Sequence, residues 1–146
     1  MDFMTALDIG ASGLSADRVQ LNVTAMNLAN AKTTRVVGDV GPYRRQSVVR
    51  TTNNIDSPFG RHMQTALDRD VKGTRVVGIA FDDRPSKRIY EPGHPDADEE
   101  GYVLYPDINV VEEMANMMTA QRNYEANSAT VEAVKAMYMK ALEIGR

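Results

Sequence analysis

The sequence of 146 residues predicts an α+β fold: a long helix at each end of the chain, the two paired as a coiled coil, with a small β-rich insert between them. Apolar residues recur at heptad spacing near both ends, 38 consecutive residues near the C-terminus lack glycine and proline, and all six prolines lie in the middle. We therefore expect three segments: an N-terminal coiled-coil helix (1–35), a β-rich insert with loops (36–106) and a C-terminal coiled-coil helix (107–146) that pairs with the first.

The first helix is expected from Phe3 to about Asn30. Its seam follows alternating spacings of three and four with one charged interruption: Met4, Leu7, Ala11, Leu14, Arg18, Leu21, Ala25 and Leu28. Asp2 or Thr5 can cap its start and Asn30 its end. Gly10 and Gly13 each cost about 1 kcal/mol relative to alanine, so the helix is weak on its own. Close helix packing explains this glycine pair better than phosphate binding.

The last helix is expected from Asp107, whose carboxylate can cap it, to Ile144. Its seam is formed by Val110, Met117, Ala120, Tyr124, Asn127, Val131, Val134, Tyr138 and Ala141, and is widened by Met114, Met118 and Leu142. An asparagine such as Asn127 within a seam is a device that fixes register. The solvent face is expected to carry Glu112, Glu113, Arg122, Glu125, Glu132, Lys135 and Lys140.

The insert combines short β-prone runs with turn residues. Strands are expected at 43–52, 74–81, 88–90 and 102–105. The stretch 51–72 is mostly polar and is expected to be a mobile loop with at most one turn of helix at 62–67.

One pair of helices buries only one seam, which leaves the methionine-rich stripe from Met114 to Met118 partly in water. An exposed apolar stripe of this kind indicates assembly. We therefore predict an assembly interface on the helix seams, made of Leu7, Leu14, Leu21, Leu28, Met114, Met117, Tyr124, Val131, Val134 and Tyr138.

Composition excludes several classes of protein. A net charge of −3 without a basic tail argues against nucleic-acid binding, and no apolar run approaches the roughly 20 residues of a membrane span. The chain has no cysteine, so disulfides and thiolate chemistry are excluded. The N-terminus does not resemble a cleavable secretory signal, so we expect any export to follow another route.

Catalytic and metal motifs are sparse. His62 and His94 have no second histidine at ligand spacing, and the acidic run of residues 96–100 lacks the glycine and the final glutamate of an EF-hand loop. A solvated turn explains that run better than a calcium site. We expect no catalytic residue, no metal and no cofactor.

Several runs carry a family resemblance. Residues 12–16 (SGLSA) and 21–31 (LNVTAMNLANA) resemble the N-terminal signature of bacterial flagellar rod and hook proteins. Residues 90–98 (YEPGHPDAD) and 106–110 (PDINV) are similar to the motif of the FlgC family of proximal rod proteins, and 118–127 (MTAQRNYEAN) continues this similarity. The resemblance covers roughly two thirds of the chain. It departs from the family where Pro106-Asp107 replaces the usual Pro-Asn, and it does not extend to residues 51–72.

The resemblance implies a structural, non-catalytic subunit of the basal-body rod, the shaft that crosses the periplasm and transmits motor torque to the distal rod and hook. It implies export by the flagellar type III apparatus without a cleaved signal, and polymerisation through the terminal helices. The implied partners are copies of the chain, neighbouring proximal and distal rod proteins, and the rod base at the export gate, without nucleic acid or direct membrane insertion.

Other hypotheses remain open from the sequence. Another rod component of the same family would share the N-terminal signature. A non-catalytic amphipathic coiled-coil adaptor could place the same stripes on a membrane or a partner helix, although the lysine and arginine excess typical of anionic lipid binding is missing. A small hydrolase would have to use His94 with Asp96 or Asp98, and no nucleophile accompanies them.

Overall fold

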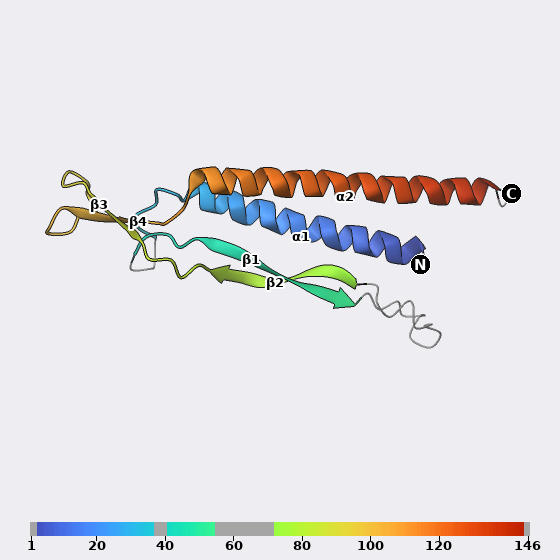
Figure 1. The fold of residues 1–146 in the computed structure, drawn as a ribbon, viewed down its shortest axis with the longest axis horizontal. Coiled ribbons are helices and arrows are strands. Elements are labelled where there is room, and N and C mark those ends of the chain that lie inside the picture. Colours follow the sequence, from blue (N-terminus) through green and yellow to red (C-terminus); the bar gives the residue numbers. More distant parts are fainter. Residues whose placement is uncertain (1–2, 37–40, 55–71, 145–146) are drawn as a thin grey trace. The chain divides into compact units, whose positions relative to one another are not determined.

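A computed structural model describes residues 3–36, 41–54 and 72–144 (Figure 1). Its elements in chain order are α1 (Phe3–Ala29), β1 (Gln46–Asn54), β2 (Lys72–Phe81), β3 (Lys87–Tyr90), β4 (Tyr102–Tyr105) and α2 (Val110–Ile144). Two terminal helices with a small strand insert confirm the α+β class. The predicted strands are present, with bounds shifted by no more than three residues, whereas the predicted helical turn at 62–67 lies outside the described residues.

Asparagine side chains cap the C-terminal end of α1 and the N-terminal end of α2. The Asn30 backbone N–H and side-chain Nδ2 both donate to the Met26 carbonyl, at 3.0 and 2.9 Å, which ends α1 near the predicted residue. At the start of α2, Asn109 Oδ1 accepts from the Val111 N–H at 3.0 Å. The prediction that Asp107 caps this helix is wrong, because its carboxylate binds Lys87 Nζ at 2.6 Å instead.

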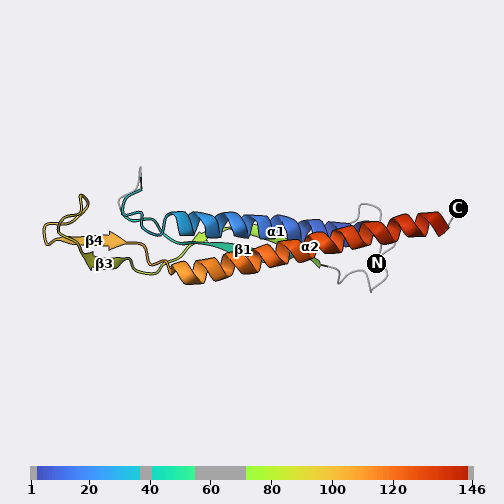
Figure 2. The same cartoon turned by 90° about the horizontal axis from the view of Figure 1, so that it is seen from above.

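The strands form two separate two-stranded sheets. The arrows of β1 and β2 point in opposite directions in Figure 1. β3 and β4 are antiparallel, with Lys87 opposite Tyr105 and Tyr90 opposite Tyr102, and lie side by side in Figure 2. Gly101, at φ 84°, closes the β3–β4 turn in a left-handed conformation that favours glycine.

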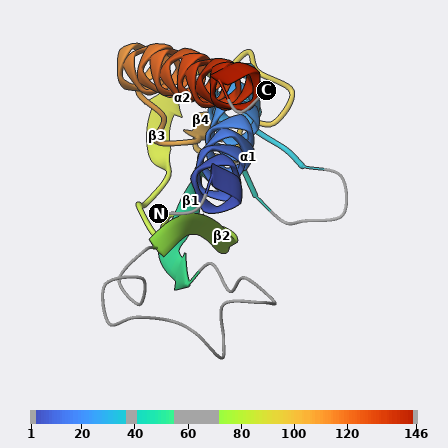
Figure 3. The same ribbon diagram turned by 90° about the vertical axis from the view of Figure 1, so that its right-hand side faces the viewer.

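The chain divides into two compact units, and each draws on both helices. Unit 1 consists of Met1–Val19, Val49–Gly78 and Thr119–Arg146. Unit 2 consists of Gln20–Val48 and Ile79–Met118. Within unit 1, the α1 and α2 segments lie side by side (Figures 1 and 3).

Small and polar side chains fill much of the interior of each unit. In unit 1 the buried residues include Ala16, Asp17 and Ala120. In unit 2 the buried residues are Val23, Thr24, Asn27, Val103, Pro106, Ile108 and Glu113. The prediction that Glu113 lies on the solvent face is wrong, because only 1% of this residue is exposed. The reason is that a carboxylate can be buried when charged and amide partners surround it.

Candidate assembly interface

In unit 1, the two helices meet through small and aromatic side chains in antiparallel order. The rings of Phe3 and Tyr138 stack with centroids 4.2 Å apart. A β-carbon on Gly10 would lie 2.6 Å from Val131 Cγ2, and one on Gly13 would lie 2.9 Å from the Asn127 amide nitrogen. The glycine pair therefore permits a close approach of the helices, as the sequence predicted.

A buried acid joins these helices to the first strand of unit 1. Asp17 Oδ2 accepts a hydrogen bond from Asn127 Nδ2 at 2.8 Å, and Asp17 Oδ1 pairs with Arg50 Nη1 at 3.1 Å. Arg50 Nη2 also donates to the Ala16 carbonyl at 3.4 Å. We name Asp17, Arg50 and Asn127 the Asp17 cluster. They line a hollow of about 250 Å³, together with the small residues Gly13 and Ala16 of α1.

Unit 2 contains a second polar group of the same kind. Glu113 Oε1 accepts from Arg45 Nη2 at 2.6 Å and from Nε at 2.9 Å, while Glu113 Oε2 accepts from Asn27 Nδ2 at 3.0 Å. Asn27 Nδ2 also donates to the Gln46 carbonyl at 2.8 Å. Asn27 Oδ1 accepts from the Gln46 N–H at 2.9 Å and from the Tyr43 hydroxyl at 3.1 Å. We name Asn27, Arg45 and Glu113 the Glu113 cluster.

The completeness of this bonding explains why polar groups tolerate burial here. Asn27 is fully buried, and each of its side-chain polar atoms has two partners. Across the described residues, no buried side-chain nitrogen or oxygen lacks a hydrogen-bond partner. Satisfied buried networks of this kind rigidify a structure and specify its geometry.

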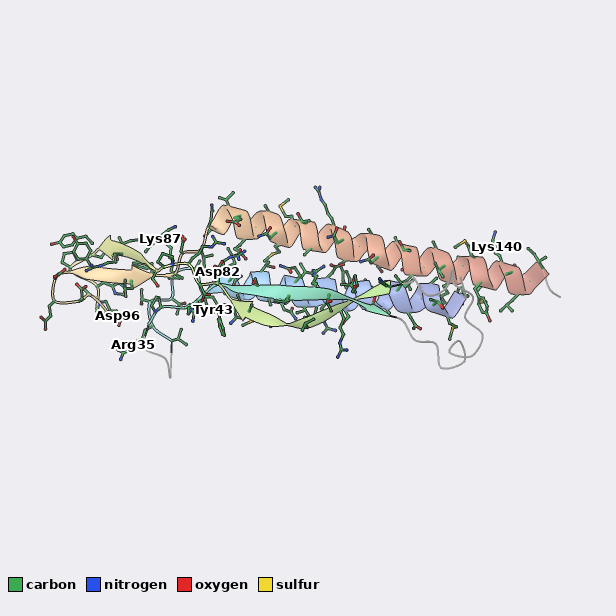
Figure 4. All side chains as sticks on the ribbon, turned by 60° about the horizontal axis from the view of Figure 1, so that its bottom comes forward. Arg35, Tyr43, Asp82, Lys87, Asp96 and Lys140 are labelled. Carbon is green, nitrogen blue, oxygen red and sulfur yellow. The ribbon has the colours of Figure 1, made fainter. Side chains whose placement is uncertain are left out.

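Charges around the Glu113 cluster shift several pKa values. Burial, followed by the negative charge of Glu113, raises the pKa of the Tyr43 hydroxyl. Burial lowers the pKa of Arg45, but its hydrogen bond to Glu113 and the nearby carboxylates outweigh this and raise it overall. Desolvation raises the pKa of Asp82, but the hydrogen bonds from Arg84 and the charges of Arg84 and Arg45 lower it overall. Tyr43 precedes β1 and Asp82 follows β2, so both are labelled at the same end of this sheet in Figure 4, where the Asp82 N–H donates to the Arg45 carbonyl at 2.8 Å.

The structure brings part of the predicted interface into contact with α1. Val131 lies against Gly10 and Tyr138 against Phe3. None of the ten predicted residues is fully buried: Leu7, Leu14, Leu21, Leu28, Met117, Val131 and Val134 are half-buried, and Met114, Tyr124 and Tyr138 are exposed. The α1 residues that contact α2 include Phe3, Gly10, Gly13, Asp17 and Asn27, each next to a predicted leucine or one turn away from it. The role of the ten residues in assembly stays a prediction.

Sequence reasoning missed the residues of the Glu113 cluster and two of the three residues in the Asp17 cluster. It singled out Asn127 as a device that fixes register, and Asn127 does belong to a buried polar group. Asn27 gave the same signal, an amide within a helical heptad. Arg45 and Arg50 gave none, because arginines in a strand are ordinarily solvated.

An exposed apolar patch lies on the first turns of α2 in unit 2. Val111 is 75% exposed, Met114 50% and Met118 57%. Their spacing of three and four residues places them on one face of the helix, opposite to the buried Glu113. Large exposed apolar patches are typical of sites of protein association.

The histidine and the acidic run are used in local structure. His94 Nδ1 accepts from the Asp96 N–H at 3.1 Å. Hydrogen bonds from the backbone N–H of Tyr102, at 2.8 Å, and of Glu100, together with Arg88, lower the pKa of Asp98. In residues 3–36, 41–54 and 72–144, no group of three His, Cys, Asp or Glu residues could hold a metal ion. His62 lies outside these ranges.

No helix among the described residues is long and apolar enough to span a membrane.

Two family models match the chain: "Flagella basal body rod protein" matches residues 7–35, and "Flagellar basal body rod FlgEFG protein C-terminal" matches residues 99–144. The matched regions include most of α1 and all of α2.

Full-length relatives decide the family. The chain is 38% identical to the flagellar basal-body rod protein FlgC of Borreliella burgdorferi, over 99% of this chain and 98% of the relative. It is 38% identical to FlgC of Bacillus subtilis, over 97% of each chain, and 39% identical to FlgC of Salmonella typhimurium, over the whole of both. The chain belongs to the FlgC family. The predicted membership of the FlgC family is thereby confirmed.

Proposed function

We propose that this member of the FlgC family is a structural subunit of the proximal rod in the bacterial flagellar basal body. The observation that carries the proposal is the similarity to FlgC rod proteins over essentially the whole chain. A structural role calls for no catalytic residue, so we propose a non-enzymatic protein.

The terminal segments 1–35 and 107–146 are the polymerising parts in this proposal. Contacts from Phe3 to Tyr138 and from Gly10 to Val131 support pairing of the two helices as an antiparallel coiled coil. The leucines of α1 and the exposed patch of Val111, Met114 and Met118 then contact neighbouring subunits. A heterologous contact of this kind does not close on itself and extends a filament.

The insert of residues 36–106 provides lateral contacts in this proposal. The β3–β4 hairpin leaves Tyr90 63% exposed and Leu104 45% exposed, which supports a contact with an adjacent rod subunit. The partners are copies of the chain, neighbouring proximal and distal rod proteins, and the rod base. Long helices packed along a periplasm-spanning shaft resist twisting and transmit torque to the distal rod and hook.

Export through the flagellar type III apparatus completes the proposal. Only Ala16, Val23, Val103, Ile108 and Ala120 among the described apolar residues are fully buried. A lone chain with so little buried apolar surface gains little from folding, so its helices remain easy to unfold for passage through a narrow channel. Secretion assays in strains with and without the export gate test this part.

Complementation tests the rod function. A motile bacterium lacking its own FlgC is expected to regain motility when it expresses this chain together with its cognate rod partners. Met118→Asp places a charge in the exposed patch and is expected to abolish incorporation into basal bodies without lowering expression. Asn22→Asp, which adds one negative charge at an exposed polar position of α1 in the same unit, serves as the matched control. Normal motility with Met118→Asp would contradict assembly through this patch.

A further inference from the structure

The apolar pattern of the two helices does not define a single register. On α1 the leucines follow each other at intervals of seven: Leu7, Leu14, Leu21 and Leu28. On α2 the same interval separates Val110, Met117, Tyr124, Val131 and Tyr138. If one helix slides along the other by seven residues, an apolar side chain still occupies nearly every one of these positions. Apolar contacts alone therefore do not select between the two arrangements.

The Glu113 cluster removes this ambiguity in unit 2. Glu113 is 1% exposed, and its two carboxylate oxygens bind Arg45 and Asn27. A slide of seven residues would bring Gln20 to the place of Asn27 and would separate Glu113 from Arg45. A buried carboxylate without its cation is strongly unfavourable. The shifted register is therefore destabilised by the unpaired charge of Glu113, whereas the packing of the apolar side chains is nearly unchanged.

The Asp17 cluster repeats the same chemistry in unit 1. Both clusters combine an arginine from β1 or the residue before it, an acid from one helix and an amide from the other. The acid lies on α1 in the Asp17 cluster and on α2 in the Glu113 cluster. The amide lies on the opposite helix in each case, so the two clusters are separate instances of the same arrangement of an acid, an amide and an arginine.

We propose that Arg45 and Arg50 are register-determining residues, which allow α1 and α2 to pair in one register only and only when β1 is docked. The biological role of this device rests on the proposed rod function. Subunits packed in a rod present several similar heptad seams to one another, so each helix has alternative partners and registers to avoid. Each arginine acts as a positioning residue, and the charge it neutralises makes a wrong register unfavourable.

Disulfide trapping reads the register directly, because the chain has no cysteine of its own. Thr24→Cys with Met117→Cys reports the native register, one turn from the contact of Asn27 with Glu113. Thr24→Cys with Val110→Cys reports the register shifted by seven residues. Each pair is oxidised in the full-length purified chain, and the cross-linked fraction is counted by mass spectrometry. Trapping captures transient pairing, so the ratio of the two fractions is informative even where the helices are only marginally stable.

The native pair is expected to dominate in the parent chain. Arg45→Met and Glu113→Gln should each lower the ratio of native to shifted cross-link by at least about tenfold. Neighbouring substitutions are the matched controls. Arg44→Met removes an exposed arginine, and Glu112→Gln an exposed glutamate. Neither control should change the ratio.

A variant in which both clusters are replaced separates register from stability. Asn27→Leu, Arg45→Met and Glu113→Met replace the Glu113 cluster, and Asp17→Leu, Arg50→Met and Asn127→Leu replace the Asp17 cluster, which joins the same two helices. Replacing buried polar groups by apolar side chains of similar size often preserves or increases stability. We expect helix content and cooperative unfolding to be retained while the ratio of native to shifted cross-link approaches one. A single native register in this variant would overturn the inference. Incorporation into basal bodies is scored separately, so a chain that pairs in one register but fails to enter rods contradicts the proposed function instead.

Discussion

Gly10 and Val131 lie so close that a β-carbon on residue 10 would come within 2.6 Å of Val131 Cγ2. Gly10→Ala is therefore expected to lower the free energy of unfolding of the assembled helix pair by about 1–3 kcal/mol, the usual effect of overpacking. This loss exceeds the gain of about 1 kcal/mol that alanine gives an isolated helix. Thermal and urea unfolding measure the difference.

The matched rescue is Gly10→Ala with Val131→Ala, in which the smaller side chain removes the clash. The double variant should be more stable than additivity of the two single variants predicts. Gly93→Ala is the control, because a β-carbon there meets no atom within 4 Å. Additive effects of the two substitutions would show that the two helices do not meet at this point.

Heptad spacing and the position of glycine and proline predicted both helices and the four strands. This worked because apolar periodicity depends only on which face a segment buries. It also assigned Val131 and Tyr138 to the face of α2 that contacts α1. The cap at the start of α2 could not be predicted, because Asp107 and Asn109 are both good caps and only the position of Lys87 decides between them.

The buried polar clusters were missed for a different physical reason. Sequence patterns treat apolar residues as inside and charged residues as outside, so Glu113 was expected in water. Its burial depends on Arg45, which lies 68 residues away in the chain. By contrast, the close contact of α1 with α2 at Gly10 and Gly13 was predicted, since small residues allow an approach that leucines prevent.

Tyr138→Ala tests the aromatic contact at the start of α1. Removing the ring that stacks on Phe3 should cost about 0.5–1.5 kcal/mol beyond the lost burial and should increase hydrogen exchange in the first turns of α1 in assembled rods. Met139→Ala, at a neighbouring residue that is 52% exposed, is the control. Equal exchange in both variants would show that the stack does not anchor this end of the helix.

Acid is expected to loosen the turn between β3 and β4. The pKa of Asp98 is lowered below its ordinary value of 3.8 by hydrogen bonds from the Tyr102 and Glu100 N–H groups and by Arg88. Its contribution to stability is therefore fully present above about pH 4 and is lost as the pH falls through the lowered pKa. The protection of the Tyr102 amide, followed by NMR against pH, measures this effect.

Asp98→Asn is the matched variant for the acid transition, because the amide keeps an acceptor oxygen but cannot titrate. We expect the protection of the Tyr102 backbone amide from hydrogen exchange to be independent of pH in the acid range in this variant. A pH dependence like that of the parent chain would assign the transition to another group.

Alkali is expected to weaken the Glu113 cluster through Tyr43. Because burial and the charge of Glu113 raise the pKa of Tyr43 above its ordinary value of 10.0, its contribution is present below pH 10 and is lost as the pH rises through the raised pKa. Spectrophotometric titration of the tyrosines, with unfolding measured in parallel, tests this. Tyr43→Phe should remove the late-titrating phenol and cost about 0.5–1.5 kcal/mol at neutral pH.

Tyr90→Phe is the control, since this side chain is 63% exposed. It should leave both the unfolding free energy and the alkaline loss of stability unchanged. An unaltered alkaline transition in Tyr43→Phe would show that the Tyr43 hydroxyl does not bind Asn27 in solution.

Hydrogen exchange on the isolated chain tests the coupling of helix folding to assembly. We expect residues 3–30 and 107–144 to exchange freely before assembly, while part of the insert is protected, because few apolar side chains of either helix are fully buried. In assembled rods the same amides should become protected. Strong protection of both helices in the monomer would contradict coupled folding and assembly.

The sequence separation within the two polar clusters has a kinetic consequence. Asn27 and Glu113 are 86 residues apart, and Asp17 and Asn127 are 110 residues apart. Contacts of such high order form late and slowly, because a long loop must close before they stabilise the chain. The 35 residues of α2 are therefore required before either cluster is complete. A chain that stalls or is truncated before α2 leaves Asp17 without Asn127 and Asn27 without Glu113, so neither polar cluster is complete until the end of the chain is in place.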